Sequence, residues 1–170
     1  LGMPLAQLRI EVAPAGELRA DGADLIRFLF TANRNTSLQP IEKVASGGEM
    51  SRLMLSLKAL VAAHAQLPTI IFDEIDTGVS GAIADKMGEI ITNLSGSLQV
   101  VNITHLPQVA SKGDHHFLVY KEETPEGTLS RIRKLSSEAR VAEIAKMLSG
   151  SAVTAAATEQ ARLLLGMEKL

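Results

Sequence analysis

Two adjacent acids, Asp73 and Glu74, directly follow an apolar run at residues 69–72. Such a run is typical of a short buried strand, and open α/β sheets bind their ligands at the carboxyl ends of strands. One carboxylate in that position could hold Mg²⁺, and its neighbour could orient or deprotonate an attacking water. The pair therefore indicates metal-assisted hydrolysis. The alternative is a strand that reaches solvent at two surface acids.

A second segment, Ser46-Gly47-Gly48-Glu49, precedes an apolar pattern of helical spacing over residues 50–65. Two glycines at a helix start let the backbone approach a ligand closely, and the first N–H groups of a helix favour an anion. Ser46 and Glu49 also have the spacing of a capping box. The segment is either a phosphate-binding helix start or an ordinary capped helix.

A third segment, Thr104-His105, follows the next apolar run at residues 98–103. A histidine at the end of a strand could donate a hydrogen bond to a terminal phosphate and so sense whether the phosphate is present. A lone histidine in a loop is the alternative. Each segment is weak evidence alone, but their order is informative because each lies on the element that its chemistry requires.

The patterning predicts an α/β domain with a central, mostly parallel sheet flanked by helices, because helices and strands alternate through the middle of the chain. An antiparallel strand pair at residues 8–12 and 25–30, around a turn at residues 14–16, is expected near the start. Residues 31–45 are expected to form a loop. The elements predicted after it are helix 50–65, strand 69–72, helix 83–94, strand 98–103, short helix 107–111, a hairpin of 116–121 and 128–134, and helices 137–148 and 153–167.

Composition excludes several classes of protein. The length of 170 residues fits a single domain. The absence of cysteine rules out disulfides and fits a reducing cytoplasm. No apolar run reaches membrane-spanning length, so no membrane partner is expected. A net charge of −2 and 3% aromatic residues provide neither a basic surface nor a stacking platform for nucleic acid.

Taken together, the three segments resemble the second half of an ATP-binding-cassette ATPase: signature motif, Walker B acids and switch histidine, in that order. The longer runs at residues 44–52, 72–81 and 103–110 narrow the resemblance to the ATPases of bacterial DNA repair that are similar to SMC (structural maintenance of chromosomes) proteins. The resemblance covers essentially the whole chain. It implies the carboxy-terminal lobe of a P-loop ATPase head that is split by a coiled coil.

The resemblance also implies roles for individual residues. Asp73 would support Mg²⁺, Glu74 would be the catalytic carboxylate that acts on water, and His105 would lie near the γ-phosphate of ATP. The segment Ser46-Gly47-Gly48-Glu49 would contact ATP bound to a second head. Asp76 and Ser80 would lie in the loop that links the two sites across the head dimer.

One required part is absent from the sequence. No G-x-x-x-x-G-K-[S/T] phosphate-binding loop occurs in it. The family carries that loop in an amino-terminal lobe, and Leu1 at the first position fits a fragment of a longer chain. We therefore expect one domain over residues 1–170, which hydrolyses ATP only with the amino-terminal lobe.

By resemblance, the complete protein would be an ATPase of DNA double-strand-break repair and recombination, cytoplasmic and associated with the nucleoid. Its partners would be a second head, in an ATP-dependent homodimer, and DNA. Two alternatives remain at this point. One is the nucleotide-binding domain of a transporter, and the other is a non-catalytic dimerisation module, against which the intact acid pair argues.

Overall fold

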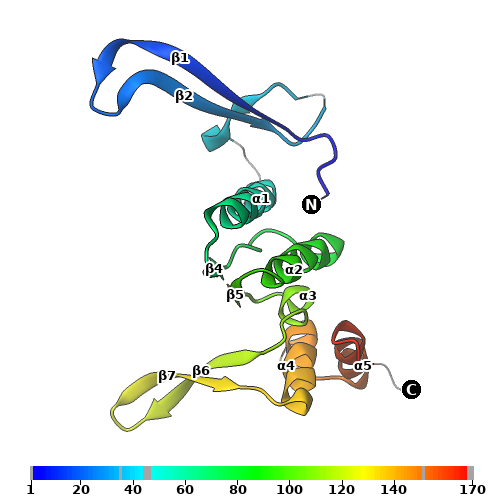
Figure 1. Ribbon diagram of the computed structural model, residues 1–170. Coiled ribbons are helices and arrows are strands. Elements are labelled where there is room, and N and C mark those ends of the chain that lie inside the picture. The colour runs from blue at the N-terminus through cyan, green and yellow to red at the C-terminus, as the bar shows by residue number, and fades with distance from the viewer. Residues whose placement is uncertain (1, 35, 44–46, 151, 168–170) are drawn as a thin grey trace.

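The computed structural model describes residues 2–34, 36–43, 47–150 and 152–167. These residues form an α/β fold in which three small sheets and the helices follow one another in sequence order (Figure 1). The first and last sheets are antiparallel, and the middle sheet is parallel. The predicted fold class is confirmed. None of the described helices is both long enough and apolar enough to cross a membrane.

The first sheet contains the predicted strand pair, here β1 (Gln7–Arg19) and β2 (Gly22–Thr31). The predicted turn at residues 14–16 is wrong, because these residues continue β1. The chain turns at Ala20 and Asp21 instead, and the strand register shifts between Pro14 and Arg19. Pro14 is tolerated inside a strand because β1 is the edge of the sheet, where a missing N–H leaves no partner unsatisfied.

The predicted loop at residues 31–45 contains two short regular elements, so this prediction was wrong in part. Strand β3 (Gln39–Pro40) pairs with the end of β2, and the 3₁₀ helix η1 (Ile41–Lys43) follows it. Two paired residues carry no periodicity of their own. Their strand conformation depends on β2 beside them.

The middle of the chain forms a parallel α/β unit from α1 (Gly47–Ala65), β4 (Thr69–Asp73), α2 (Gly81–Ser95), β5 (Gln99–Ile103) and the short α3 (Pro107–Ala110). These elements agree with the prediction to within a few residues. Phe72 of β4 is fully buried and packs with Leu55 of α1, Met87 of α2 and Val109 of α3. All three helices therefore contribute to the core on the face of the sheet that carries Phe72.

The opposite face of the β4–β5 sheet is bare. Ile71 is 61% exposed, and Val101 and Ile103 on the neighbouring strand are 43% and 50% exposed. Side chains alternate across a strand, so these three lie on the face away from Phe72. The helices cover one face of the parallel sheet and leave an apolar face to solvent.

The last part of the chain is a hairpin followed by two helices. Strands β6 (Phe117–Thr124) and β7 (Gly127–Lys134) form the predicted hairpin, and α4 (Ser137–Ser149) packs against α5 (Ala155–Leu164) through Ile144, Ala145 and Ala161. The guanidinium of Arg140 on α4 donates to the backbone oxygens of Ser111, Gly113 and Asp114, which holds the chain after α3 against α4. Burial and the positive charge of Arg140 lower the pKa of nearby His116.

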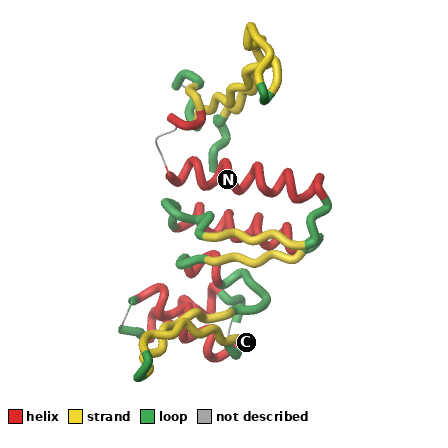
Figure 2. The backbone as a smooth tube through the Cα atoms, turned by 90° about the vertical axis from the view of Figure 1, so that its left-hand side faces the viewer, coloured by secondary structure: helices red, strands yellow, loops and turns green. Residues whose placement is uncertain are grey.

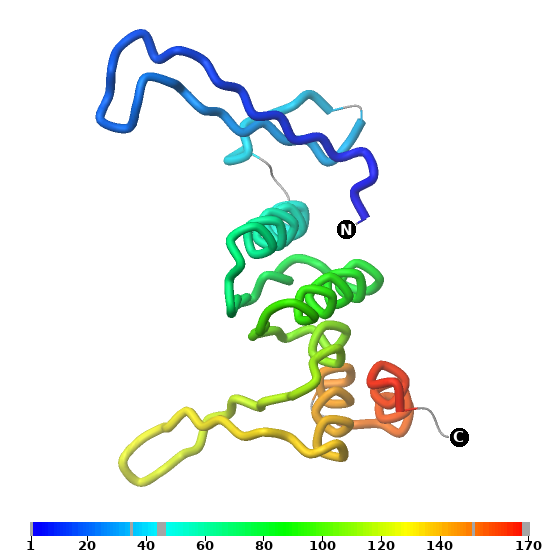
Figure 3. Tube along the Cα trace, in the orientation of Figure 1, coloured from blue at the N-terminus to red at the C-terminus, as the bar shows by residue number. Residues whose placement is uncertain are grey.

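The two long hairpins give the molecule an open shape. The helices stack from top to bottom, and β1–β2 and β6–β7 both project to the left of this column (Figures 1 and 3). Seen from that side, β4 and β5 lie in front of α2 (Figure 2). The bare face of the parallel sheet therefore looks toward the space that the two hairpins flank.

A close backbone contact joins the start of α1 to the turn after β4. A Cβ atom placed on Gly48 would lie 2.5 Å from the carbonyl oxygen of Gly78, and Gly78 itself has a φ of +80°. The contact requires glycine at both positions, at Gly48 for space and at Gly78 for both space and backbone conformation. It fixes the first turn of the helix on the loop that carries the acids.

Replacing Gly48 with alanine is expected to destabilise the fold by about 1–3 kcal/mol, because the added methyl overpacks a backbone contact. The midpoint of urea unfolding measures the effect. Gly47→Ala is the matched control, since no described atom lies within 4 Å of a Cβ at that position, and its effect should stay within about 0.5 kcal/mol. Equal stability of the two variants would contradict the contact.

Candidate functional site

The parallel pairing of β4 and β5 brings the predicted catalytic residues to one edge of the sheet. Asp73 is in register with Ile103, and the backbone N–H of Glu74 donates to the oxygen of Ile103 at 3.0 Å. His105 follows two residues later. The side chains of Asp73, Glu74 and His105 are all exposed at this edge. They therefore lie at the end of the sheet where parallel α/β folds bind their ligands.

Glu74 has an unusual backbone. Its φ is +47°, a region that residues with a side chain adopt rarely and at a cost of about 1–3 kcal/mol. The conformation is held because the carbonyl oxygen of Glu74 accepts from the Thr77 N–H at 3.1 Å and from Thr77 Oγ1 at 2.9 Å. The strain is located at the residue that the sequence assigns to water activation.

Asp76 is buried beneath the exposed residues of the site and bonds to the segment that carries His105. Its side chain is fully buried, and one carboxylate oxygen accepts a hydrogen bond from Thr104 Oγ1. Thr104 Oγ1 in turn accepts from the N–H of Leu106 at 2.9 Å. Within the described chain, the second oxygen of Asp76 has no hydrogen-bond partner. Asp76 thereby joins the turn after β4 to the segment that carries His105.

Ser80, the other residue predicted for the dimer loop, is exposed at the start of α2 and makes no capping hydrogen bond through its side chain. The structure thus separates the two residues. Asp76 is buried and bonds within the fold, whereas the Ser80 side chain is exposed to solvent.

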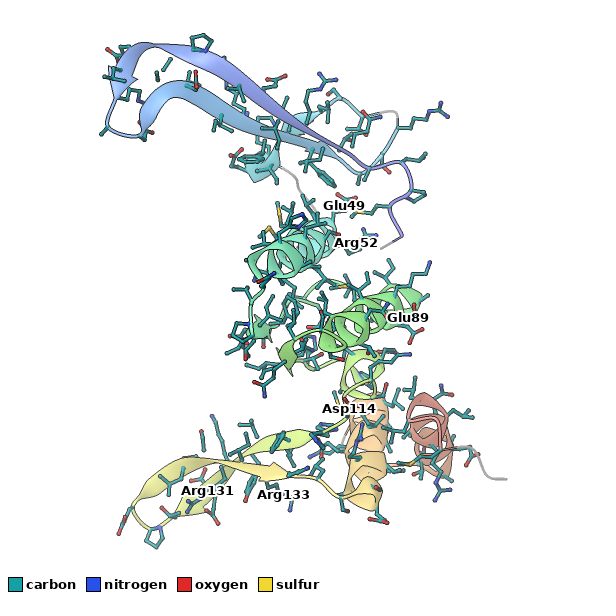
Figure 4. The ribbon with its side chains drawn as sticks, in the orientation of Figure 1. Glu49, Arg52, Glu89, Asp114, Arg131 and Arg133 are labelled. Carbon is teal, nitrogen blue, oxygen red and sulfur yellow. The ribbon has the colours of Figure 1, made fainter. Side chains whose placement is uncertain are left out.

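The start of α1, where residues 47–49 of the predicted nucleotide-contacting segment lie, packs against the same turn. Gly47 begins α1 and is exposed, Gly48 is buried against Gly78, and Glu49 is half-buried. Ser46 lies outside the described residues. Glu49 and Arg52 lie on the side of α1 that faces the amino-terminal sheet (Figure 4). Arg52 donates to the oxygens of Gly48 and Gly2, which adds further contacts at this helix start.

The carboxylate of Asp73 is chemically suited to be one ligand of a magnesium ion. Mg²⁺ is commonly held by one or two carboxylates together with water and substrate phosphates, and the Asp73 carboxylate is an exposed hard oxygen donor at the strand end. No group of three or more acids, histidines or cysteines suited to a metal occurs in the part of the chain that the structure describes.

Three residues of the site were not assigned roles from the sequence: Ser51, Thr77 and Thr104. Ser51 Oγ donates to the oxygen of Thr77 at 2.8 Å, across 26 residues of sequence. Thr77 and Thr104 hold Glu74 and Asp76 as described above. All three lie within the runs at residues 44–52, 72–81 and 103–110, which was the one sequence feature that pointed to them. Serine and threonine have no characteristic spacing that would have indicated their hydrogen-bond partners.

Thr104→Val is expected to destabilise the chain by about 1–3 kcal/mol, because a buried carboxylate loses its hydroxyl donor. Urea unfolding measures the loss. Thr104→Ser keeps the hydroxyl and should recover most of it. If valine and serine are equally stable, the bond to Asp76 contributes nothing measurable.

Comparison with curated proteins relates the chain to one group. It is 41% identical over 166 residues to the DNA repair protein RecN of Vibrio cholerae, a match that covers 97% of this chain and 30% of the relative. RecN of Bacillus subtilis is 43% identical over 149 residues, covering 88% of this chain and 26% of the relative. The chain therefore spans less than a third of the length of these relatives. No family model matches it.

Solved structures give the fold. The SMC head domain of Pyrococcus yayanosii, with a coiled coil and joint, aligns over 84% of this chain and 26% of its own, with a TM-score of 0.65 and 20% identity. A solved SMC ATPase, described for ATP-driven dimerization and DNA-stimulated activation, aligns over 88% of this chain and 85% of its own, with a TM-score of 0.62 and 17% identity. The chain is thus a homologue of a segment of RecN DNA-repair proteins and has the fold found in SMC ATPase heads.

Proposed function

We propose that this chain supplies the carboxy-terminal lobe of a split ATPase head that acts in DNA double-strand-break repair and recombination. The observation that supports this most directly is the placement of Asp73, Glu74 and His105 at adjacent ends of two parallel strands, beside the start of α1. The sequence similarity to RecN proteins adds the link to repair. The whole of residues 1–170 would act as this one lobe.

The proposed reaction is hydrolysis of MgATP held between two heads. Asp73 would hold Mg²⁺, which would neutralise charge on the phosphates. Glu74 would orient or deprotonate the attacking water, and His105 would contact the γ-phosphate. The residues Ser46, Gly47, Gly48 and Glu49 would close the nucleotide of a second head, so that turnover requires a homodimer.

The amino-terminal lobe of the same protein would complete each site. Sheets with only parallel strands normally have both faces covered, and here Ile71, Val101 and Ile103 leave one face apolar and exposed. That face looks toward the space flanked by the two hairpins (Figure 2). An apolar sheet from a second lobe would cover it and bring in the phosphate-binding loop that this sequence lacks.

The DNA partner rests on the relatives' name, because a net charge of −2 gives this chain no general attraction to nucleic acid. A repair function would place the protein in the bacterial cytoplasm with the nucleoid. Two other functions were open from the sequence. The transporter domain has no support among the relatives compared, and a non-catalytic module would have no use for the strained backbone of Glu74.

Glu74→Gln in the full-length protein is expected to lower ATP turnover by at least about a hundredfold, the range of a general base. ATP-dependent association of heads should persist, because the amide keeps the size of the carboxylate. Steady-state hydrolysis and light scattering measure the two effects. Retained turnover would remove Glu74 from the catalytic role.

Ile71→Lys is expected to weaken binding of this chain to the separate amino-terminal lobe by at least about tenfold. Burial of an isoleucine contributes about 1.5–3 kcal/mol, and a buried lysine would add a desolvation cost. Titration calorimetry measures the affinity. ATP hydrolysis should appear only when this chain is mixed with the amino-terminal lobe.

Glu89→Lys is the control, since Glu89 is exposed on α2 on the side away from the hairpins (Figure 4). Unchanged affinity of the Ile71 variant would place the contact elsewhere. Turnover by this chain alone would refute the need for a second lobe.

A further inference from the structure

We propose that Thr77 is a positioning residue that transmits the position of α1 to Glu74 in the same chain. The inference rests on the proposed function, which assigns Glu74 to hydrolysis and the start of α1 to closure over a nucleotide. It adds a physical connection between these two parts of one lobe.

Thr77 is bonded on both sides. Toward Glu74, its N–H and its hydroxyl both donate to one carbonyl oxygen, at 3.1 and 2.9 Å. Toward α1, its own carbonyl oxygen accepts from Ser51 Oγ at 2.8 Å. Three hydrogen bonds thus connect the second turn of the signature helix to the backbone of the proposed catalytic residue.

The turn at Thr77 cannot shift independently of α1, because the backbones beside it are closely packed. Gly78 follows Thr77 directly and lies against Gly48 so closely that a Cβ on either glycine would be within 3.0 Å of the other's backbone. A displacement of the first turn of α1 must therefore move Gly78 and Thr77 as well. Close-packed contacts of this kind transmit displacement because they do not deform continuously.

Glu74 is sensitive to such a displacement. Its φ of +47° is maintained by the bonds to Thr77 on one side and by the bond from its N–H to Ile103 on the other. A non-glycine residue keeps this conformation only where its surroundings hold it. The direction of the carboxylate follows from the backbone, so loss of the Thr77 hydroxyl changes where the carboxylate points.

The test uses the full-length protein and four single variants: Thr77→Val, Thr77→Ser, Ser51→Ala and Ser56→Ala. Ser56 is the matched control, because its hydroxyl donates to Arg52 within α1 and has no bond to the turn. For each variant kcat and KM for ATP, ATP-dependent association and the thermal midpoint are measured.

Thr77→Val is expected to lower kcat by about tenfold or more, since a small misplacement of a reacting group has that effect. KM and association should stay within about twofold of the parent protein. Thr77→Ser should restore kcat, because serine keeps the hydroxyl. Ser51→Ala should also lower kcat, and its effect should shrink in the Thr77→Val background, since both act through one path. Ser56→Ala should leave kcat unchanged.

An unchanged kcat in Thr77→Val overturns the proposal, and so does a parallel loss of kcat and association, which would show general damage. If Thr77→Val fails to fold, the variants Thr77→Ser and Ser51→Ala test the proposal instead. A low kcat in Thr77→Ser overturns it, and so does an effect of Ser51→Ala on kcat that is no larger than that of Ser56→Ala. The Glu74→Gln variant separates the two proposals. Turnover in that variant would refute the ATPase assignment, whereas an inactive Glu74→Gln beside a fully active Thr77→Val would refute the coupling alone.

Discussion

The backbone contact between Gly48 and Gly78 is the constraint on which the geometry of this chain depends. It brings the first turn of α1 onto the turn after β4 with no side chain between them. Ser51 can then reach Thr77, and Thr77 can hold Glu74. The contact and these hydrogen bonds together connect the start of α1 to the backbone of Glu74.

The site has an exposed layer and a buried layer with different tasks. Asp73, Glu74 and His105 are exposed and can meet a ligand, whereas Asp76 is fully buried below them and bonds Thr104. Buried polar groups with defined partners fix the direction of the groups above them. The buried bond between Asp76 and Thr104 therefore joins the turn after β4 to the segment that carries His105 without any ligand.

The same architecture leaves one face of the parallel sheet without a covering element among the described residues. Helices α1, α2 and α3 share the core with Phe72, but no described element covers Ile71, Val101 and Ile103. The match to less than a third of each RecN relative agrees with this openness. An apolar sheet face and an exposed pair of acids at one edge of it are both consistent with half of a shared site.

The order of the elements in the parallel unit, and the position of Asp73, Glu74 and His105 just at or after strand ends, could be predicted from the sequence, because apolar periodicity and strand ends are local properties. It did not determine the turn of the first hairpin, where Pro14 favoured a turn but an edge position tolerated it inside β1. The sequence also predicted only part of the role of Gly48. The glycine that suggested close approach to a ligand is required for close approach to Gly78.

Only the tertiary structure showed that Asp76 is buried, that Thr104 bonds it, and that Ser51 and Thr77 connect α1 to Glu74. The bond from Ser51 to Thr77 and the bond from Thr104 to Asp76 join residues 26 and 28 positions apart in the chain. Hydroxyl side chains have no periodicity that would reveal such partners. Residue types indicate which chemistry the strand ends could perform, but the contacts that hold these residues depend on which loops the packing brings together.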